Sequence, residues 1–304
     1  MANPVLSLAS FAARVLPASF KQAIYKSGPL AALIRRTLNR AAPSGLVQAR
    51  VAAGDLAGYT LLLDMQTEKD YWLGTYEPEL QAALHDLVRP GDTVYDVGAN
   101  IGYVSLLLAR AAGEAGRVYA FEALPDNVER LRSNLRLNGI QARVTVLPGA
   151  VTQASGPVRF YVHASGGMGK AAGSAGRTDE PYQAEISVPG LSLDEFVYAQ
   201  GNPPPQAVKM DIEGGEVLAL PGMRRVLAEA RPVMLMELHG PECARTAWEA
   251  LTAAGYDVCW MKPGYPRVPS LEALDWKSYI AARPISPLPA KRPRRGLGER
   301  RGEG

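Results

Sequence analysis

The feature that most constrains this chain is a strand, a glycine-containing loop and a helix within residues 93–110. Residues 93–97 are β-branched or aromatic except for one aspartate, as in a buried strand. Gly98 and Gly102 mark the loop, and the apolar run after it predicts a helix. Residues 117–121 form a second predicted strand, which continues a nucleotide-binding βαβ unit. The alternation of strand and helix signals beyond it predicts an α/β fold: a mostly parallel twisted sheet of about seven strands, with helices on both faces.

The polar residues around this loop indicate which nucleotide it binds. Glu122 ends the second strand, about 20 residues past the loop, where an acid binds ribose hydroxyls. A dinucleotide loop would have glycine at position 100, but this chain has Asn100. Asp96 would repel a pyrophosphate and attract the sulfonium or amino group of S-adenosylmethionine (SAM). We therefore expect SAM as the cofactor, bound by Asp96, Gly98, Asn100, Gly102 and Glu122, with Ala150 beside the adenine.

Several motifs resemble those of the FkbM-type SAM-dependent methyltransferases. They are VYDVGANIG at 94–102, FEA at 121–123, LNG at 137–139, VKMDIEGGE at 208–216 and MELH at 236–239. The K-x-D-x-E-G-x-E run is independent of the glycine loop, whereas Ala123 departs from the proline usual in the family. The resemblance covers roughly residues 76–262. It implies a Rossmann-like methyltransferase fold and O-methylation of a hydroxyl on a sugar, glycan or secondary metabolite.

Three acidic residues and one histidine lie at the ends of the fourth and fifth predicted core strands. Asp211 and Glu213 end the fourth strand, while Glu237 and His239 end the fifth. Ligands of open α/β sheets bind outside the carboxyl ends of the strands, so we expect all four residues at the cleft, with Asp211 also beside the cofactor. A hydroxyl acceptor must lose a proton, and we predict that Asp211 and Glu213 handle it, with His239 and Glu237 as further candidates.

Structural roles are the alternative for each of these residues. Asp211 and Glu213 could cap the helix that follows, and His239 could be a polar residue with satisfied hydrogen bonds. The resemblance implies that Glu77 lies near the cofactor, but an acid also suits the first helical turn that begins there. Mg²⁺ could bind oxygen ligands of this kind, yet the spacing does not require an ion, and we expect no metal.

Two other classes of function are alternatives to methyl transfer. A nicotinamide-dependent oxidoreductase or epimerase needs G-x-G-x-x-G and usually Tyr-x-x-x-Lys, and the chain contains neither. A non-catalytic binding protein with a SAM-type fold would leave the acids of the D-I-E run without a purpose.

We predict four regions along the chain. A helical segment spans 1–45, a β-hairpin with a lead-in helix spans 46–90, and the SAM-binding domain spans 91–284. The last includes a glycine-rich lid at 164–178, which has few apolar residues to bury. A basic, proline-rich tail at 285–304 is expected to be disordered. In the first segment, apolar residues at helical spacing favour a helix packed on the domain over one lying on a membrane surface: Leu30, Leu33, Ile34 and Leu38.

Composition and cysteine content limit the classes of binding partner and the compartment that we expect. The 304 residues are 47% hydrophobic and 21% charged, as in a soluble globular protein, and the net charge of +3 does not call for nucleic acid. Two cysteines are too few for a disulfide framework and predict buried thiols in a reducing compartment, the cytoplasm. The expected partner is a small-molecule or glycan acceptor with a hydroxyl group; the sequence carries no signal for an oligomeric state.

Overall fold

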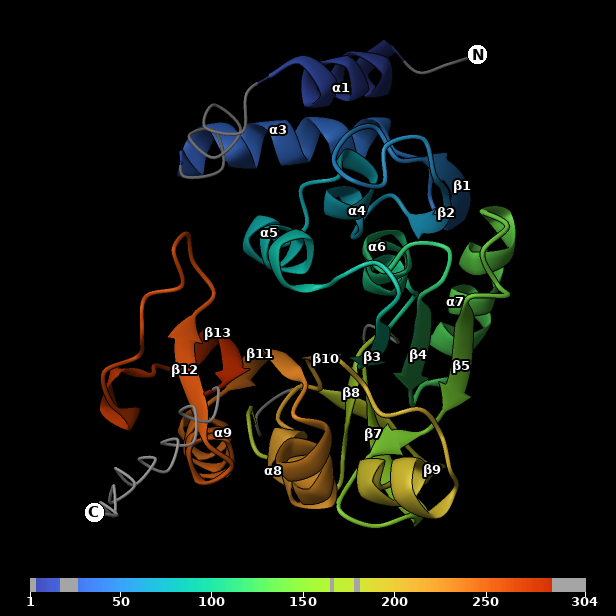
Figure 1. The fold of residues 1–304 in the computed structure, drawn as a ribbon. Helices are drawn as coiled ribbons and strands as arrows, with labels where there is room; N and C mark the ends of the chain where they lie inside the picture. Colours follow the sequence, from blue (N-terminus) through green and yellow to red (C-terminus); the bar gives the residue numbers. More distant parts are fainter. Residues whose placement is uncertain (1–3, 17–26, 165–166, 178–180, 286–304) are drawn as a thin grey trace, which may run out of the picture.

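The structure is a computed structural model that describes residues 4–16, 27–164, 167–177 and 181–285. Its centre is a seven-stranded sheet in the order β12-β13-β11-β10-β3-β4-β5 (Figure 1). All neighbouring strands are parallel except those that pair with β13. The strand at 93–97 is therefore central, and the predicted doubly wound α/β fold is confirmed. Strand order reverses between β3 and β10, and such a reversal is where ligands bind in this class of fold.

The strands of this sheet are short and their carboxyl ends carry the loops of interest. Their bounds are β3 Thr93–Val97, β4 Arg117–Glu122, β5 Val144–Pro148, β10 Ala207–Met210, β11 Val233–His239, β12 Tyr256–Trp260 and β13 Lys277–Pro284. The longer helices around it are α5 Pro78–Leu87, α6 Tyr103–Ala111, α7 Pro125–Leu137 and α9 Pro241–Ala253. Shorter helical turns are α4 Lys69–Leu73, η1 Glu195–Ala199, α8 Glu216–Ala219, η2 Leu220–Met223, η3 Val226–Ala230 and η4 Leu271–Ala273.

Residue alternation along each strand divides the core into two layers. Val94 and Ala207 pack with helices α5, α6 and α7, whereas their neighbours Tyr95 and Val208 pack with α9 and the turns around α8. Successive strand residues point to opposite faces, so strands buried on both faces read as nearly continuous apolar runs. This is why these strands could be predicted from the sequence.

β13 is the strand that the sequence pattern does not anticipate. It lies between β11 and β12 and pairs antiparallel with both strands. Half of its residues are buried there. Its sequence, KSYIAARP, contains a single β-branched residue, so strand propensity is weak and pairing decides its conformation.

A second sheet of four strands, in the order β6-β9-β7-β8, stands beyond the carboxyl ends of β3 to β5 (Figure 1). Its strands are β6 Ala150–Val151, β7 Gly156–His163, β8 Gly169–Ala171 and β9 Tyr182–Leu191. The glycine-rich run has few apolar residues to bury, and its strand β8 supplies one of them to a core. Ala171 is buried in a small core with Phe160 and Val188, because pairing with β7 brings it there. Residues 165, 166 and 178 of the run lie outside the described part, and lid motion stays a prediction.

The amino-terminal part consists of α1 Pro4–Val15, α3 Gly28–Ala41 and the predicted hairpin of β1 Leu46–Arg50 and β2 Thr60–Asp64. Asn138 ties the hairpin to α7, since its side-chain amide accepts a hydrogen bond from Thr60 N and donates one to Thr60 O. This contact gives the Asn of the LNG motif a structural purpose.

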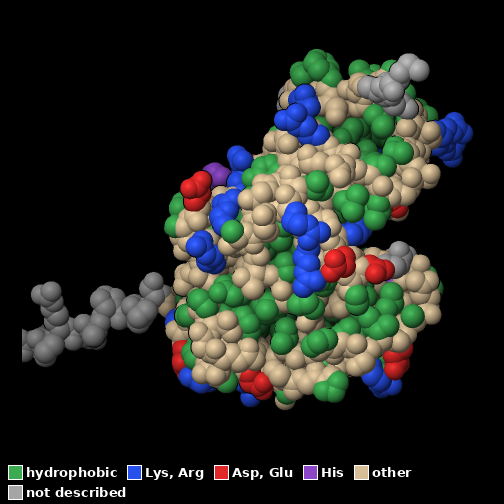
Figure 2. All heavy atoms as spheres, turned by 90° about the vertical axis from the view of Figure 1, so that its right-hand side faces the viewer, with side chains coloured by type: hydrophobic (Ala, Val, Ile, Leu, Met, Phe, Trp, Pro, Cys, Tyr) green, Lys and Arg blue, Asp and Glu red, His purple; other side chains and the backbone are tan. Residues whose placement is uncertain are grey.

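The apolar stripe of α3 is only partly covered. Leu38 is buried, but Leu30, Leu33 and Ile34 are exposed among the described residues, so the expectation of a fully packed helix holds for Leu38 alone. Figure 2 shows hydrophobic and basic side chains together at the top of the molecule, where Figure 1 places α1 and α3. Contact with a membrane surface remains a prediction. None of the helices in the described residues has the length and apolarity to cross a bilayer.

The predicted tail from residue 286 onward lies outside the described residues. Both cysteines, Cys243 and Cys259, are free thiols and buried, as the composition predicts.

Candidate active site

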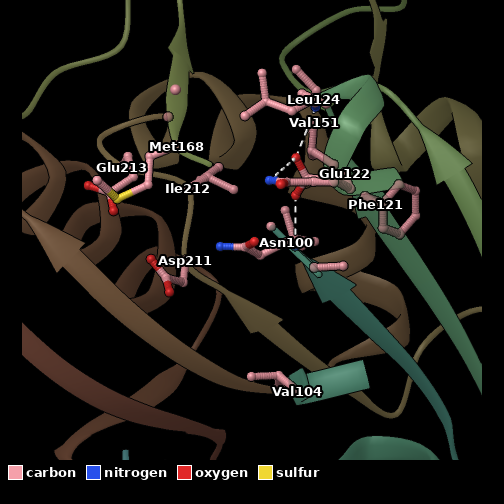
Figure 3. Close-up of a pocket in the computed structure, with 18 of the residues that line it drawn as sticks. Asn100, Val104, Phe121, Glu122, Leu124, Val151, Met168, Asp211, Ile212 and Glu213 are labelled. Carbon is pink, nitrogen blue, oxygen red and sulfur yellow. Dashed lines mark hydrogen bonds between the residues drawn. The ribbon is translucent and has the colours of Figure 1, made fainter. Parts of the chain in front are cut away.

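A pocket of about 290 Å³ opens at the switch between β3 and β10. It is bounded by the loops that follow β3, β4 and β10 and by the second sheet. Figure 3 shows Glu122, Leu124 and Val151 on one side and Asp211 and Glu213 on the other. The pocket is thus apolar with one acid at one end and carries two carboxylates at the other.

Two glycines of the first loop serve close packing. Gly98 has φ +81°, and a Cβ there would lie 1.9 Å from the carbonyl oxygen of Asp211. A Cβ at Gly102 would lie 2.3 Å from Leu131 Cδ1 on α7. These glycines therefore let the loops of β3 and β10 approach each other and let the loop pack on α7. Of the two, only Gly98 lines the pocket.

Glu122 lies at the end of β4, where the sequence analysis placed the ribose-binding acid. Its Oε2 accepts a hydrogen bond of 2.7 Å from Asn100 N, and its Oε1 accepts one of 2.9 Å from Leu124 N. Burial raises the pKa of Glu122, while these donors oppose the shift. Asn127 Nδ2 donates a third, longer hydrogen bond of 3.4 Å to Oε1. A carboxylate has about four acceptor positions, so about one remains for a ribose hydroxyl.

The remaining residues at this end fit an adenosine. Ala150, Val151 and Phe121 line the pocket beside Glu122 and offer an apolar surface for a base. At the far end, Asp211 and Glu213 supply negative charge that would attract a sulfonium or an ammonium group. The residues present therefore fit SAM, with the adenosine toward Glu122 and the methionine part toward Asp211.

Asp96 does not line this pocket, although the sequence analysis expected it to face the cofactor's cationic end. It is fully buried, and Ser105 Oγ donates a 2.6 Å hydrogen bond to its Oδ2. Its Oδ1 lies 3.4 Å from Lys209 Nζ. Lys209 also donates to the carbonyl oxygen of Gly98 at 2.8 Å and lies 3.9 Å from Asp211 Oδ2. Asp96 therefore stabilises the loop indirectly, because it pairs with Lys209, which donates to the loop carbonyl of Gly98.

Lys209 is a site residue for which the sequence motifs predicted no role. It is only 4% exposed and connects the ends of β3 and β10. The sequence did contain a signal for this role, namely a lysine in the middle of an apolar strand. Such a lysine is expected to be buried, and a buried lysine needs a charged partner.

His239, at the end of β11, stands among four carboxylates. Its Nδ1 lies 3.1 Å from Glu216 Oε1, and its Nε2 lies 3.2 Å from Glu237, 3.6 Å from Glu213 and 3.7 Å from Asp211. Burial disfavours the imidazolium, but hydrogen bonds to Glu216 and Glu237 outweigh it and raise the pKa of His239 to about 11. The imidazole is therefore a cation at neutral pH, with both N–H groups directed at carboxylates.

Its partner Glu237 has a lowered pKa. Burial acts to raise its pKa, but hydrogen bonds from His239 and Lys277 prevail and lower the pKa of Glu237 to about 2. Lys277 Nζ forms a short ion pair with Glu237 Oε1. Glu237 is therefore a weak base that holds two cations in place.

Asp211 has the opposite character. Its side chain is 20% exposed and lines the pocket. Burial raises the pKa of Asp211 to about 7; the nearby charges of Glu237 and Glu77 add to the shift, and Lys209 opposes it. A carboxylate with a pKa near 7 is suited to exchange a proton at physiological pH.

Strained backbone marks the rim of the site. Glu77, Asn100 and Glu213 all have positive φ, at 41°, 49° and 53°. Such conformations cost about 1–3 kcal/mol for a residue with a side chain and cluster at functional sites. Glu77 begins α5 without a side-chain cap bond and does not line the pocket, although its charge acts on Asp211. Its neighbour Tyr76 does line it, with its ring tilted against Tyr71 and edge-on to Tyr103.

Three residues are close enough to share a metal ion. Ligand atoms of Asp211, Glu237 and His239 lie within 4.8 Å of one another. However, Lys209 beside Asp211 and Lys277 beside Glu237 already supply positive charge there. The expectation that no metal is needed stays a prediction.

The fold and the pocket together define a SAM-dependent methyltransferase, and sequence comparison identifies the family. The methyltransferase FkbM domain matches residues 96–258, more than half of the chain. The chain therefore belongs to the FkbM methyltransferase family, and SAM is its cofactor.

Individual relatives are more distant. The hexuronic acid methyltransferase AglP of Haloferax volcanii is 27% identical over 190 residues, which are 61% of this chain and 73% of AglP. A protein-L-isoaspartate O-methyltransferase of Aeropyrum pernix is 46% identical over 61 residues, or 20% of this chain and 24% of that protein. The solved methyltransferase FkbM of Methylobacillus flagellatus is 19% identical with a TM-score of 0.39, over 83% of this chain and 59% of that one.

Replacement of Glu122 by alanine tests the cofactor end of the pocket. We expect SAM affinity to fall about 10- to 150-fold, because hydrogen bonds to a charged group contribute roughly 1.5–3 kcal/mol. Calorimetric titration with SAM measures this, and Glu129→Ala, an exposed acid on α7, is the matched control. A parental affinity in the Glu122 variant would remove this residue from cofactor binding.

Proposed function

We propose that this protein transfers the methyl group of SAM to a hydroxyl oxygen of a sugar or glycan. Membership of the FkbM family supports methyl transfer. The observation that carries the choice of a hydroxyl is Asp211, a pocket carboxylate with its pKa raised to about 7. A hydroxyl must be deprotonated as it attacks, and a base of this pKa suits the task. The similarity to AglP, a hexuronic acid methyltransferase, supports a sugar as acceptor.

The cofactor supplies an activated methyl group on a sulfonium, and residues of the chain deprotonate and orient the acceptor. Asp211 accepts the proton of the acceptor hydroxyl and orients its oxygen toward the pocket. Lys209, 3.9 Å away, keeps part of the Asp211 population ionised at neutral pH. His239, held by Glu216 and Glu237, fixes the carboxylates around the acceptor side. Much of the rate enhancement in such a displacement comes from positioning.

The other candidate bases are less suited to the role. His239 is protonated at neutral pH because its pKa is raised to about 11, and Glu237 has a pKa lowered to about 2. Glu213 is 50% exposed and lies 3.6 Å from His239 Nε2. We therefore place the proton on Asp211 and assign Glu213 to contact with the acceptor.

Radiolabelled SAM and a panel of sugar acceptors test this proposal. The expected product is a methyl ether, stable to mild alkali, on a sugar hydroxyl. Absence of transfer to every hydroxyl acceptor, with label found on nitrogen or carbon of another substrate, would refute it.

A further inference from the structure

A second cavity of about 180 Å³ adjoins the cofactor pocket. Met168, Gly169 and Glu213 line both, so the two spaces meet at these residues. Figure 3 shows Met168 and Glu213 together at the end of the pocket away from Glu122. The adenosine fits at the Glu122 end, so the second cavity begins where the methyl group would point.

Cationic side chains outnumber acids on the wall of this cavity. Arg177, Lys277 and His239 line it, whereas Glu213 is its single lining carboxylate among the described residues. The positive charge of His239 is balanced by two buried carboxylates, Glu216 and Glu237, which are 0% and 5% exposed. Arg177 is exposed, and Lys277 is 54% exposed at its side chain. Lys277 Nζ is paired with Glu237, but an ammonium group has three N–H donors, so it can contact a ligand as well.

An aromatic surface completes the cavity. Trp276 lines it and is 47% exposed, which is unusual for so large an apolar side chain. Its backbone is held in place, because Gly240 N donates a 2.7 Å hydrogen bond to Trp276 O. A Cβ on Gly240 would lie only 3.2 Å from the indole ring, so the glycine gives the ring room. An exposed indole offers a flat face for the C–H groups of a sugar ring.

We propose that the second cavity binds the acceptor as a pyranose ring that bears an anionic group, with the ring on Trp276 and the anion at Arg177 and Lys277. This rests on the proposed function and adds the acceptor's chemical class. The anion is held at the cationic wall, and the reacting hydroxyl then faces Asp211. A carboxylate or a phosphate on the sugar satisfies the same chemistry, because guanidinium and ammonium groups bind both.

Binding without turnover is the direct test. Methyl β-D-glucuronide, glucose 6-phosphate and methyl β-D-glucoside are titrated by NMR against the protein saturated with S-adenosylhomocysteine. We expect the two anionic sugars to bind at least about tenfold more tightly than the glucoside, and the tighter of them identifies the anion. Equal affinities for all three would overturn the proposal, even if the protein methylates neutral sugars and the proposed function stands.

Variants locate the contacts. Arg177→Gln should lower affinity for the preferred anionic sugar about tenfold and leave glucoside affinity unchanged, while Trp276→Ala should weaken both and Trp276→Tyr should restore most of the loss. Lys262→Met and Trp260→Ala are matched controls, since Lys262 lies over the Trp260 ring outside both cavities. Thermal unfolding checks that each variant is folded. Unchanged sugar binding in folded Arg177→Gln and Trp276→Ala would refute the assignment. A product that is an alkali-labile methyl ester would also refute it, because the anion would then lie at the methyl group.

Discussion

Asparagine in place of Asp211 is expected to lower kcat by about 10²-fold or more, while SAM still binds. Asparagine keeps the size and most hydrogen bonds of aspartate but cannot accept the acceptor's proton. Single-turnover methyl transfer to a verified acceptor measures the chemical step, with SAM affinity measured in parallel. Asp257→Asn, at an exposed pair with Arg267, is the matched control and should have parental activity.

The pH profile provides an independent readout of the same residue. The pKa of Asp211 is raised to about 7, so its ionised, basic form is the minor form below pH 7 and the major form above it. We therefore expect kcat to rise with pH through about 7 in the parent and to lose this step in Asp211→Asn. Glu213→Gln should keep the inflection and, because Glu213 is assigned to contact with the acceptor, should raise the acceptor KM more than it lowers kcat. Near-parental rates in both single variants and in the double variant would exclude these acids and leave His239 and Glu237 as candidates.

Methionine in place of Lys209 is expected to reduce the free energy of unfolding by about 3–5 kcal/mol, as when one partner of a buried ion pair is removed. Lys209 is 4% exposed, and its loss leaves Asp96, which is fully buried, without a counter-charge. The hydrogen bond from Lys209 to Gly98 O is lost as well. Urea unfolding measures the change, and Lys262→Met, an exposed lysine, should be neutral within about 0.5 kcal/mol.

A double variant separates charge from packing. Asp96→Asn combined with Lys209→Met removes both charges and should recover a large part of the lost stability, because no uncompensated ion remains. Equal destabilisation in the single and double variants would show that packing, not the ion pair, holds Lys209 in place. Loss of Lys209 should also raise the pKa of Asp211 further, since the lysine favours the carboxylate, and shift any residual activity to higher pH.

Local pattern was sufficient for the central part of the fold. Residues 93–122 show a strand, a loop and a second strand with an acid at its end, and each of these signals depends on neighbours in sequence. Buried parallel strands must be apolar on both faces, so they stand out from the chain. Glu122 was found for the same reason, because its distance from the loop is fixed by the length of one βαβ crossover.

Long-range pairing determined what local pattern missed. β13 and β8 have weak strand propensity and are strands because their neighbours supply hydrogen-bond partners and burial. The pairing of β6 to β9 into a second sheet and the second cavity have no signature in any single segment. Glu216, whose Oε1 lies beside His239 Nδ1, is the last acid of the K-x-D-x-E-G-x-E run, and its role depends on the contact between α8 and β11.

By itself, therefore, the sequence determined the fold class, the cofactor, the family and the four polar residues at the strand ends. Only the tertiary structure decided how protons and charges are distributed among them. Asp96, expected at the cofactor, is neutralised by Lys209; His239 becomes a cation; and Asp211 is left with a pKa near 7. The physical reason is that a pKa depends on burial and on charges within a few ångströms, and those neighbours come from β3, β10, β11 and α8, which are far apart in the chain.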